Sequence, residues 1–182
     1  MFKAFWQFIF KIFGWKVVGH FPFDTRKTII VAAPHTSNWD FFVGLGTRSI
    51  LRFNSSFLIK KSWLSKPVIG ALLRKAGGVG VDRSKNVKLT DQIAEIFNQR
   101  EEFRIAIAPE GTRKYNPDWK TGFWHIAKKA NIPLLPVTFN YVKKEVEFLD
   151  LFHLTDDKDS DIERLKSLYR DIPGKNPELG VR

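Results

Sequence analysis

Residues 28–34 read TIIVAAP and residues 103–109 read FRIAIAP, two short apolar runs that each end at a proline. Apolar runs of this length, bounded by turn residues, are typical of strands that are buried on both faces of a sheet. Helical patterns alternate with such strands along the rest of the chain. This alternation predicts an α/β fold with a largely parallel or mixed central sheet that is flanked by helices.

The remaining elements are predicted from the same two signals, short apolar runs for strands and helical spacing of apolar residues for helices. A helix is expected from Ser37 or Asn38 to about Ile50, and further helices over 62–75, from Ser84 onward, over 121–130 and over 158–171. Strands are expected within 55–61, 77–81 and 132–139, with an edge strand within 143–149. Because ligands of such folds gather beyond the carboxyl ends of strands, the residues after Pro34 and Pro109 are the first candidates for a site.

Composition limits the classes of protein to consider. The chain has 182 residues, of which 43% are apolar and 27% charged, and no linker or repeat divides it, so we expect one globular domain. The absence of cysteine excludes disulfides, thiolate zinc sites and a cysteine nucleophile. The net charge is +11, and residues 1–90 hold 15 basic but only three acidic side chains. Such an excess favours partners that carry phosphate.

The first 18 residues form an aromatic, basic segment, and the single globular domain is expected to occupy 19–182. Lys3, Gln7 and Lys11 would align as a narrow polar stripe on a helix that is otherwise aromatic or aliphatic. The apolar run is too short to span a bilayer, and no signal-peptide cleavage site follows it. The pattern predicts an interfacial amphipathic helix over 1–18 that lies on a membrane surface. The alternative is a first helix that packs on the protein's own core.

The segment PHTSNWD at 34–40 brings a histidine and an aspartate within reach of each other. If a helix opens near Ser37, Asp40 lies in its first turn and can bind the ring N–H of His35, which leaves the other ring nitrogen as a proton acceptor. A metal site is less well supported, because no second histidine stands three or four residues from His35. A serine triad through Ser37 is also weakly supported, because no G-x-S-x-G turn exists.

The segment APEGTRK at 108–114 places Glu110, Gly111, Thr112 and Arg113 directly after a strand. Glycine allows a tight turn and arginine can grip a phosphate with two parallel hydrogen bonds. Arg83 follows the glycine-rich turn of GGVGVDRS at 77–84, which lacks the spacing of a P-loop. For both segments the alternative is a polar turn with solvated side chains.

Four segments together resemble a known family. PHTSNWD, GGVGVDRS, APEGTR and IPLLPV occur in the order and spacing of the four motifs of the glycerolphosphate and lysophospholipid acyltransferases, over about residues 28–140. The resemblance implies that His35 is a general base that Asp40 orients. It further implies that the acceptor phosphate is bound by Arg83 and by the turn of the third motif, that is by Glu110, Gly111, Thr112 and Arg113.

The function implied by the resemblance is transfer of a fatty acyl group from an acyl thioester to a hydroxyl of a lysophospholipid such as 1-acylglycerol-3-phosphate. The implied partners are acyl-CoA or acyl carrier protein, the lysophospholipid and a membrane surface, with no cofactor and no metal. Peripheral or monotopic attachment at the cytoplasmic face of the membrane would follow. Alternatives are an O-acyltransferase for another membrane lysolipid, a non-enzymatic membrane-surface protein, and a basic nucleic-acid-binding module. No nucleic-acid-binding motif accompanies the charge, so we expect no nucleic-acid partner.

Overall fold

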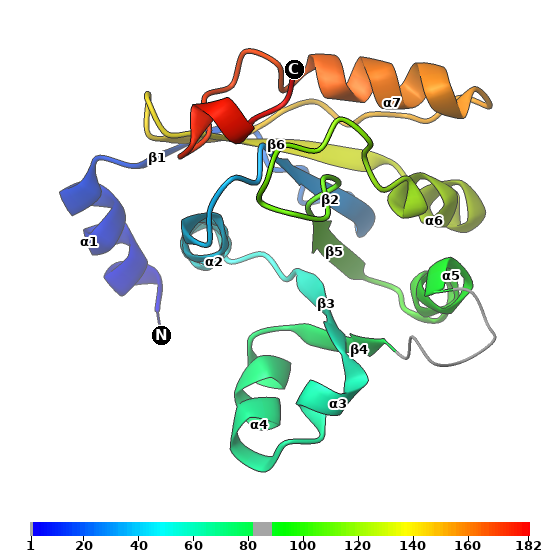
Figure 1. The fold of residues 1–182 in the computed structure, drawn as a ribbon. Coiled ribbons are helices and arrows are strands. Elements are labelled where there is room, and N and C mark those ends of the chain that lie inside the picture. The colour runs from blue at the N-terminus through cyan, green and yellow to red at the C-terminus, as the bar shows by residue number, and fades with distance from the viewer. Residues whose placement is uncertain (1, 82–88) are drawn as a thin grey trace.

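A seven-stranded sheet forms the centre of the molecule in the computed structural model, which describes residues 2–81 and 89–182 (Figure 1). The strand order is β1-β7-β6-β2-β5-β3-β4. The strands are β1 (Lys16–Gly19), β2 (Lys27–Ala33), β3 (Ser56–Lys60), β4 (Gly78–Val81), β5 (Phe103–Ile107), β6 (Leu134–Asn140) and β7 (Glu145–Phe148). Neighbouring strands are parallel except β6 and β7. The predicted α/β fold with a mixed sheet and flanking helices is confirmed.

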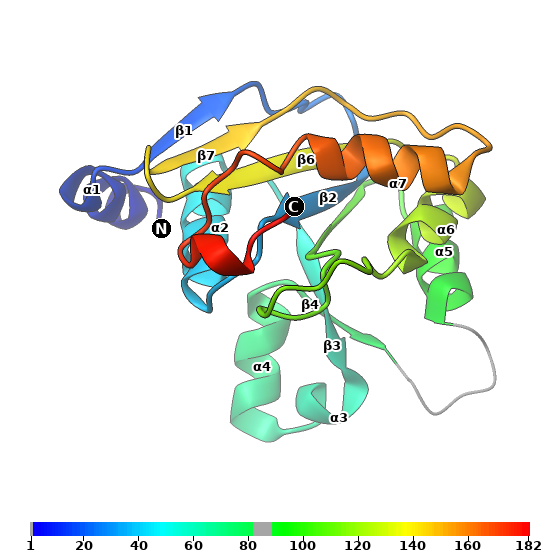
Figure 2. The ribbon, with the colours of Figure 1, turned by 45° about the horizontal axis from the view of Figure 1, so that its top comes forward.

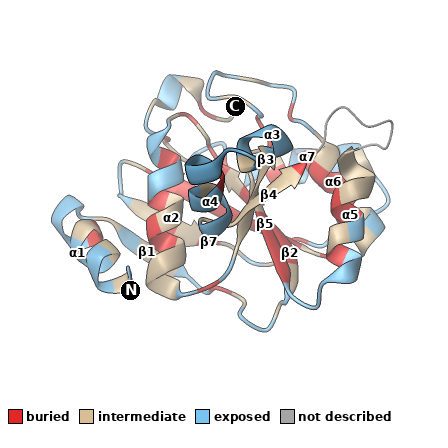
Figure 3. Ribbon diagram, turned by 90° about the horizontal axis from the view of Figure 1, so that it is seen from below, coloured by how far each residue is buried: buried red, intermediate tan, exposed pale blue. Residues whose placement is uncertain are grey.

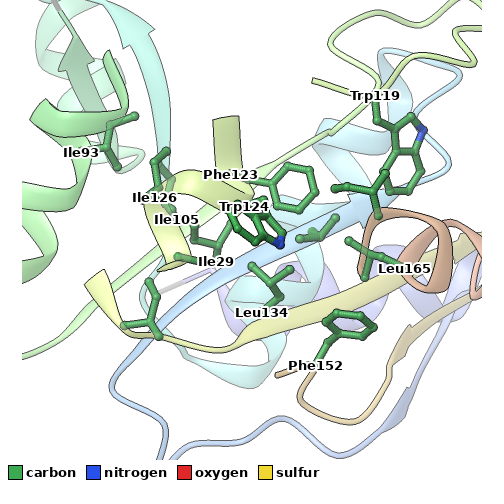
Figure 4. Close-up of a cluster of buried hydrophobic side chains, with 14 of the residues drawn as sticks. Ile29, Ile93, Ile105, Trp119, Phe123, Trp124, Ile126, Leu134, Phe152 and Leu165 are labelled. Carbon is green, nitrogen blue, oxygen red and sulfur yellow. The ribbon is translucent and has the colours of Figure 1, made fainter. Parts of the chain in front are cut away.

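Helices cover both faces of the sheet and bury two apolar clusters. On one face, α5 (Leu89–Gln99), α6 (Gly122–Ala130) and α7 (Lys158–Ser167) pack against β2, β5 and β6. Figure 4 shows Phe123 and Trp124 of α6 beside Ile29 and Leu134 of the sheet. On the other face, α1 (Lys3–Phe13) and α2 (Trp39–Leu51) cover the second cluster. The central strand β2 is accordingly among the most deeply buried elements (Figure 3).

Residues 62–75 form two helices instead of the single one that the sequence predicts. They are α3 (Lys61–Leu64) and α4 (Pro67–Lys75), and both lie beside β3 and β4 at one end of the sheet (Figure 2). Lys66 is extended, with ψ of 128°, because a residue that precedes proline avoids the helical region. Ser84, where a further helix is expected to begin, lies outside the described residues, and α5 falls within the expected segment. The helix α7 ends at Ser167, short of the expected position 171.

The N-terminal segment differs from the expected helix over 1–18. The helix α1 ends at Phe13, where Gly14 adopts a left-handed conformation with φ of 73°. Lys16–Gly19 then form β1, which pairs with β7 and occupies the edge of the sheet. The strand predicted within 143–149 is present as β7, but its predicted position at the edge is wrong, because β1 pairs with its outer side.

One face of α1 packs on the protein and the other is open to solvent. Phe10 is buried, and a Cβ atom added to Gly46 of α2 would lie 2.5 Å from its ring, so the two helices are in close contact. The exposed large apolar side chains of this segment are Phe2, Phe5, Phe8, Ile12 and Phe13. The burial of Phe10 agrees with packing on the protein's own core, and the membrane-surface interpretation stays a prediction. Within 2–81 and 89–182, we find no helix of the length and apolarity that crossing a membrane requires.

Candidate active site

Polar side chains follow the carboxyl ends of three neighbouring strands, β2, β5 and β6. The strands β2 and β5 run in parallel, with Val31 opposite Ile107, so the loops that follow them leave the sheet side by side. The strand β6 is parallel to β2 on its other side, with Ala33 opposite Thr138, and ends at the same edge. The site therefore forms at the carboxyl ends of adjacent strands, as the sequence predicts.

His35 and Asp40 meet as the sequence predicts, and the carboxylate of Asp40 is surrounded by donors. Its Oδ2 atom lies 2.9 Å from His35 Nδ1 and accepts hydrogen bonds from the backbone N–H groups of Thr36 (3.0 Å) and Ser37 (2.9 Å). Its Oδ1 atom accepts a hydrogen bond of 2.6 Å from the hydroxyl of Tyr141. The Asp40 side chain is only 1% exposed, whereas that of His35 is 26% exposed. A carboxylate only accepts, so Nδ1 of His35 carries the proton and Nε2 is free to accept one.

Glu110 reaches from the second loop to the first. Its Oε1 atom accepts a hydrogen bond of 2.8 Å from the backbone N–H of His35, and the residue is only 5% exposed. Burial raises the pKa of the Glu110 carboxyl, although the hydrogen bond from His35 opposes this effect. Among the described residues, its Oε2 atom has no hydrogen-bond partner. Glu110 thus fixes the backbone of the loop that holds His35 and keeps one buried oxygen available.

The other candidates of the second loop lie at the surface. Gly111 turns the chain with φ of +66°, and the hydroxyl of Thr112 accepts a hydrogen bond from the backbone N–H of Lys114. The exposed Arg113 donates through Nη1 to the side-chain oxygen of Asn38, which joins the two loops. Arg83 lies outside the described residues. Of the predicted site residues, His35, Asp40, Glu110 and Arg113 are thereby connected through the loop at 35–38.

An apolar cavity opens beside His35. It has a volume of about 280 Å³ and extends between α2 and the sheet. Apart from His35, Asn38, Asp40 and Arg48, its walls are mostly aliphatic and aromatic, including Phe41, Leu45, Phe57, Val137 and Phe148. At its far end, Arg48 Nη1 donates to the carbonyl oxygens of Ser55 (3.0 Å) and Ala76 (2.6 Å). The cavity can hold an apolar chain whose reactive end lies at the imidazole.

Two residues of the site were missed by the sequence analysis, and both follow the recognised motifs. Tyr141 binds Asp40 directly. Asn176 binds Thr36 twice, through its side-chain amide to the Thr36 carbonyl (2.8 Å) and through its backbone N–H to the Thr36 hydroxyl (3.2 Å). Tyr141 follows the predicted strand within 132–139, and that position at the carboxyl edge was the one available signal. Nothing in the sequence pattern points to Asn176.

Side chains that could bind a metal ion do not cluster in the part of the chain that the structure describes. No group of three or more His, Asp or Glu side chains there has the geometry to hold an ion. The interactions that organise the site are instead hydrogen bonds between a histidine, two carboxylates and the loop backbone.

Residues 15–140 match the family model described as Acyltransferase, and the chain therefore belongs to this family. It is 31% identical to the 1-acyl-sn-glycerol-3-phosphate acyltransferase of Escherichia coli (strain K12) over 142 residues, which cover 74% of this chain and 57% of that protein. It is 32% identical to the enzyme of the same name from Saccharomyces cerevisiae over 129 residues, which cover 67% of this chain and 41% of that protein. The chain thus spans little more than half the length of the first relative and less than half of the second.

A solved structure shares the fold. The 1-acyl-sn-glycerophosphate (LPA) acyltransferase PlsC from Thermotoga maritima superimposes with a TM-score of 0.64 at 17% sequence identity, and the match covers 91% of this chain and 74% of that one. The match extends beyond residues 15–140, so the arrangement of the sheet and its flanking helices is common to both proteins.

Proposed function

We propose that this protein transfers a fatty acyl group from an acyl thioester to the hydroxyl of a lysophospholipid, with 1-acylglycerol-3-phosphate as the first candidate. The observation that carries the proposal is the His35–Asp40 pair at the mouth of an apolar cavity. Family membership and the names of the relatives support acyl transfer as the reaction and a glycerophosphate as the acceptor.

The proposed mechanism uses His35 as a general base. Its Nδ1 atom donates to Asp40, so Nε2 takes the proton of the acceptor hydroxyl while the oxygen attacks the thioester carbonyl. The new C–O ester bond forms, the C–S bond breaks, and the imidazolium returns the proton to the thiolate that leaves. Asp40 stabilises the imidazolium between these steps. No covalent acyl-enzyme is required, and the acyl donor is acyl-CoA or acyl carrier protein.

The acceptor phosphate is assigned to the second loop. Arg113 is exposed and bound to Asn38, so its guanidinium lies beside the catalytic loop while the rest of its donors remain accessible. We assign Gly111 and Thr112, through the backbone of their turn, and Arg83 to the same subsite, and Glu110 to its inner wall. Binding the phosphate there would hold the hydroxyl near His35, and such positioning contributes a large part of many enzymatic accelerations.

The acyl chain of the donor is assigned to the cavity beside His35. Its walls are apolar for most of their area, which suits a hydrocarbon chain and leaves the thioester at the polar mouth. A chain that enters this cavity leaves water, and this burial is the main source of its binding free energy.

Membrane attachment is assigned to the exposed face of α1, in a peripheral or monotopic arrangement at the cytoplasmic face. Four apolar side chains of α1 are exposed, namely Phe5, Phe8, Ile12 and Phe13, and Lys11 is exposed as well. Aromatic insertion combined with lysines near anionic headgroups is a known mode of interfacial binding. Both proposed substrates have acyl chains, so attachment would place the site next to its lipids.

The membrane assignment is tested by sedimentation with vesicles of phosphatidylcholine and phosphatidylglycerol. Changing Phe5, Phe8, Ile12 and Phe13 together to Ser should release the protein even at low salt, because it removes exposed apolar side chains that would insert into the membrane. The matched control changes Val68 and Leu72 of α4, which are equally exposed, to Ser and should leave binding unchanged. Equal binding of the α1 variant and the wild type would contradict the assignment.

The reaction is tested by thiol release from acyl-CoA in the presence of a panel of lysophospholipids, with product analysis by mass spectrometry. We expect transfer to the glycerophosphate acceptor and a loss of several orders of magnitude in His35→Ala, because the proton acceptor is removed. Transfer to a different lysolipid of the panel would retain the mechanism and change the acceptor. Undiminished turnover in folded His35→Ala would refute the mechanism.

A further inference from the structure

The catalytic carboxylate has one hydrogen bond that the family motifs do not supply. Its Oδ2 atom accepts three hydrogen bonds from residues 35–37 of the same loop. Its Oδ1 atom accepts one from the hydroxyl of Tyr141, which lies 101 positions further along the chain. Tyr141 also lies one residue beyond the segment that matches the family. Asp40 is almost fully buried, so an Oδ1 atom without a donor would be costly there.

We propose that Tyr141 is a positioning residue for the His35–Asp40 pair. Through its hydrogen bond to Asp40 Oδ1, the Tyr141 hydroxyl orients the carboxylate and reduces the negative charge that faces His35. This inference rests on the proposed acyl transfer and adds to it a residue outside the four motifs. Tyr141 does not touch the reacting atoms. It acts on them through the carboxylate that holds Nδ1 of His35.

The position of the Tyr141 hydroxyl is fixed by several contacts. The residue directly follows β6, so its backbone begins at the edge of the sheet where β2 also ends. Its backbone N–H donates to the carbonyl of Pro173 at 2.9 Å. Its ring packs edge-on against the ring of Trp15, with 4.9 Å between centroids and an angle of 90°. These contacts hold the hydroxyl at hydrogen-bond distance from Asp40 without help from a substrate.

The hydroxyl acts only as a donor to the carboxylate. Burial and the hydrogen bond to Asp40 raise the pKa of Tyr141, so the phenol stays protonated throughout the neutral range. Other titratable groups near the pair come from other elements: Glu110 binds the backbone of His35, Arg113 binds Asn38, and Lys175 lies over the ring of Trp39. None of these three donates a hydrogen bond to Asp40 in the described part of the chain.

The effect of the hydroxyl follows from how a carboxylate shares its charge. A donor on Oδ1 draws negative charge away from Oδ2, which faces the imidazole. Without this donor, Asp40 would stabilise the imidazolium more strongly and would be freer to rotate. The proton would then stay on the imidazole up to a higher pH than in the wild type. The imidazole would also be less well oriented toward the hydroxyl of the acceptor.

Tyr141→Phe tests the proposal, because it removes one oxygen atom and keeps the ring against Trp15. We expect kcat to fall by about 10- to 100-fold with the KM of donor and acceptor changed less than about twofold. The acid limb of the pH profile of kcat/KM should move to higher pH. The matched control is Tyr169→Phe, which also loses a buried hydroxyl bond, of 2.7 Å to the Val31 carbonyl, but does not touch Asp40. Tyr169→Phe should lower stability and leave the acid limb in place.

A second measurement does not depend on turnover. The NMR signals of the His35 ring carbons, assigned by their loss in His35→Ala, should move at neutral pH toward their low-pH position in Tyr141→Phe and stay in place in Tyr169→Phe. Failure of the wild type to acylate any lysolipid would refute the proposed function, while this shift would still support Tyr141 as the positioning residue. Unchanged ring signals in Tyr141→Phe, or an unchanged kcat and acid limb in an active enzyme, would overturn the inference.

Discussion

The loop after β2 and the loop after β5 leave the same edge of the sheet, but they differ in how their polar groups are used. In the first loop, the backbone N–H groups of His35, Thr36 and Ser37 all donate to carboxylates. In the second loop, Gly111 and Arg113 are exposed, and the Thr112 hydroxyl supports only its own turn. The first loop is also held from outside, by Tyr141 at Asp40 and by Asn176 at Thr36.

The first loop thus holds its polar groups in a fixed geometry, whereas the second loop leaves its charged group accessible to solvent. A proton acceptor needs an orientation that is fixed before the substrate arrives, and the buried carboxylate of Asp40 with four donors supplies it. A group that binds a phosphate must instead exchange water for its ligand, which an exposed guanidinium can do. In the proposed mechanism, the first loop therefore serves the chemical step and the second serves binding, and Glu110 connects the two loops.

Asp40→Asn should have the largest effect among the variants that test this comparison. We expect kcat to fall by about 100- to 10,000-fold, but less than in His35→Ala, because the base remains while its orientation and the stabilisation of the imidazolium are lost. Steady-state kinetics at saturating substrate measure this loss. Ser37→Ala is the control, because in the described part of the chain its hydroxyl bonds only the exposed backbone N–H of Trp39, so kcat should stay within a few-fold. A loss in Ser37→Ala as great as in Asp40→Asn would contradict a mechanism without a serine nucleophile.

Arg113→Ala should affect binding more than the chemical step. We expect the acceptor KM to rise by about 10- to 100-fold, which corresponds to the loss of one charge-assisted contact of about 1.5–3 kcal/mol. Lys114→Ala removes the neighbouring exposed cation and serves as the control for net charge. Separate titrations of donor and acceptor measure the two KM values. If only the donor KM rose, Arg113 would bind the phosphates of coenzyme A instead.

Glu110→Gln should change how stability depends on pH. Burial raises the pKa of Glu110 above its ordinary value of 4.5, so between this value and the raised one the folded protein binds more protons than the unfolded chain. The contribution of Glu110 to the free energy of unfolding therefore falls as pH rises through that window. Glutamine does not titrate, so the stability of the variant relative to the wild type should increase with pH over the same window.

Urea unfolding at a series of pH values measures this difference. Glu163→Gln is the control, because Glu163 is exposed and paired with Arg170 at the surface. Its difference from the wild type should change little over the same window. A stability difference of Glu110→Gln that decreased with rising pH would show that the charged form is favoured in the folded state.

The extent to which the sequence predicts this structure depends on how local each contact is. The strands β2 and β5 are predicted because continuous apolar runs have few alternatives, and His35 meets Asp40 because the two are five residues apart on one loop. The edge strand β1 is missed because its few residues are stabilised by pairing with β7, more than 120 positions away. Tyr141 and Asn176 are missed for the same reason, since their partners lie 101 and 140 positions away.

Thr112→Ala should have the smallest effect and tests whether the second loop binds through charge alone. The hydroxyl of Thr112 accepts one hydrogen bond of 3.2 Å from the backbone N–H of Lys114, in an exposed turn where water can replace it. Surface changes of this kind alter stability by about 0.5 kcal/mol or less. We therefore expect an acceptor KM within about threefold of the wild type, measured beside Arg113→Ala with the same lysophospholipid. Thr112→Ser, which keeps the hydroxyl, is the control. If Thr112→Ala raised the acceptor KM as much as Arg113→Ala while Thr112→Ser did not, the hydroxyl would itself be a phosphate ligand and the second loop would bind through oriented polar groups as well as charge.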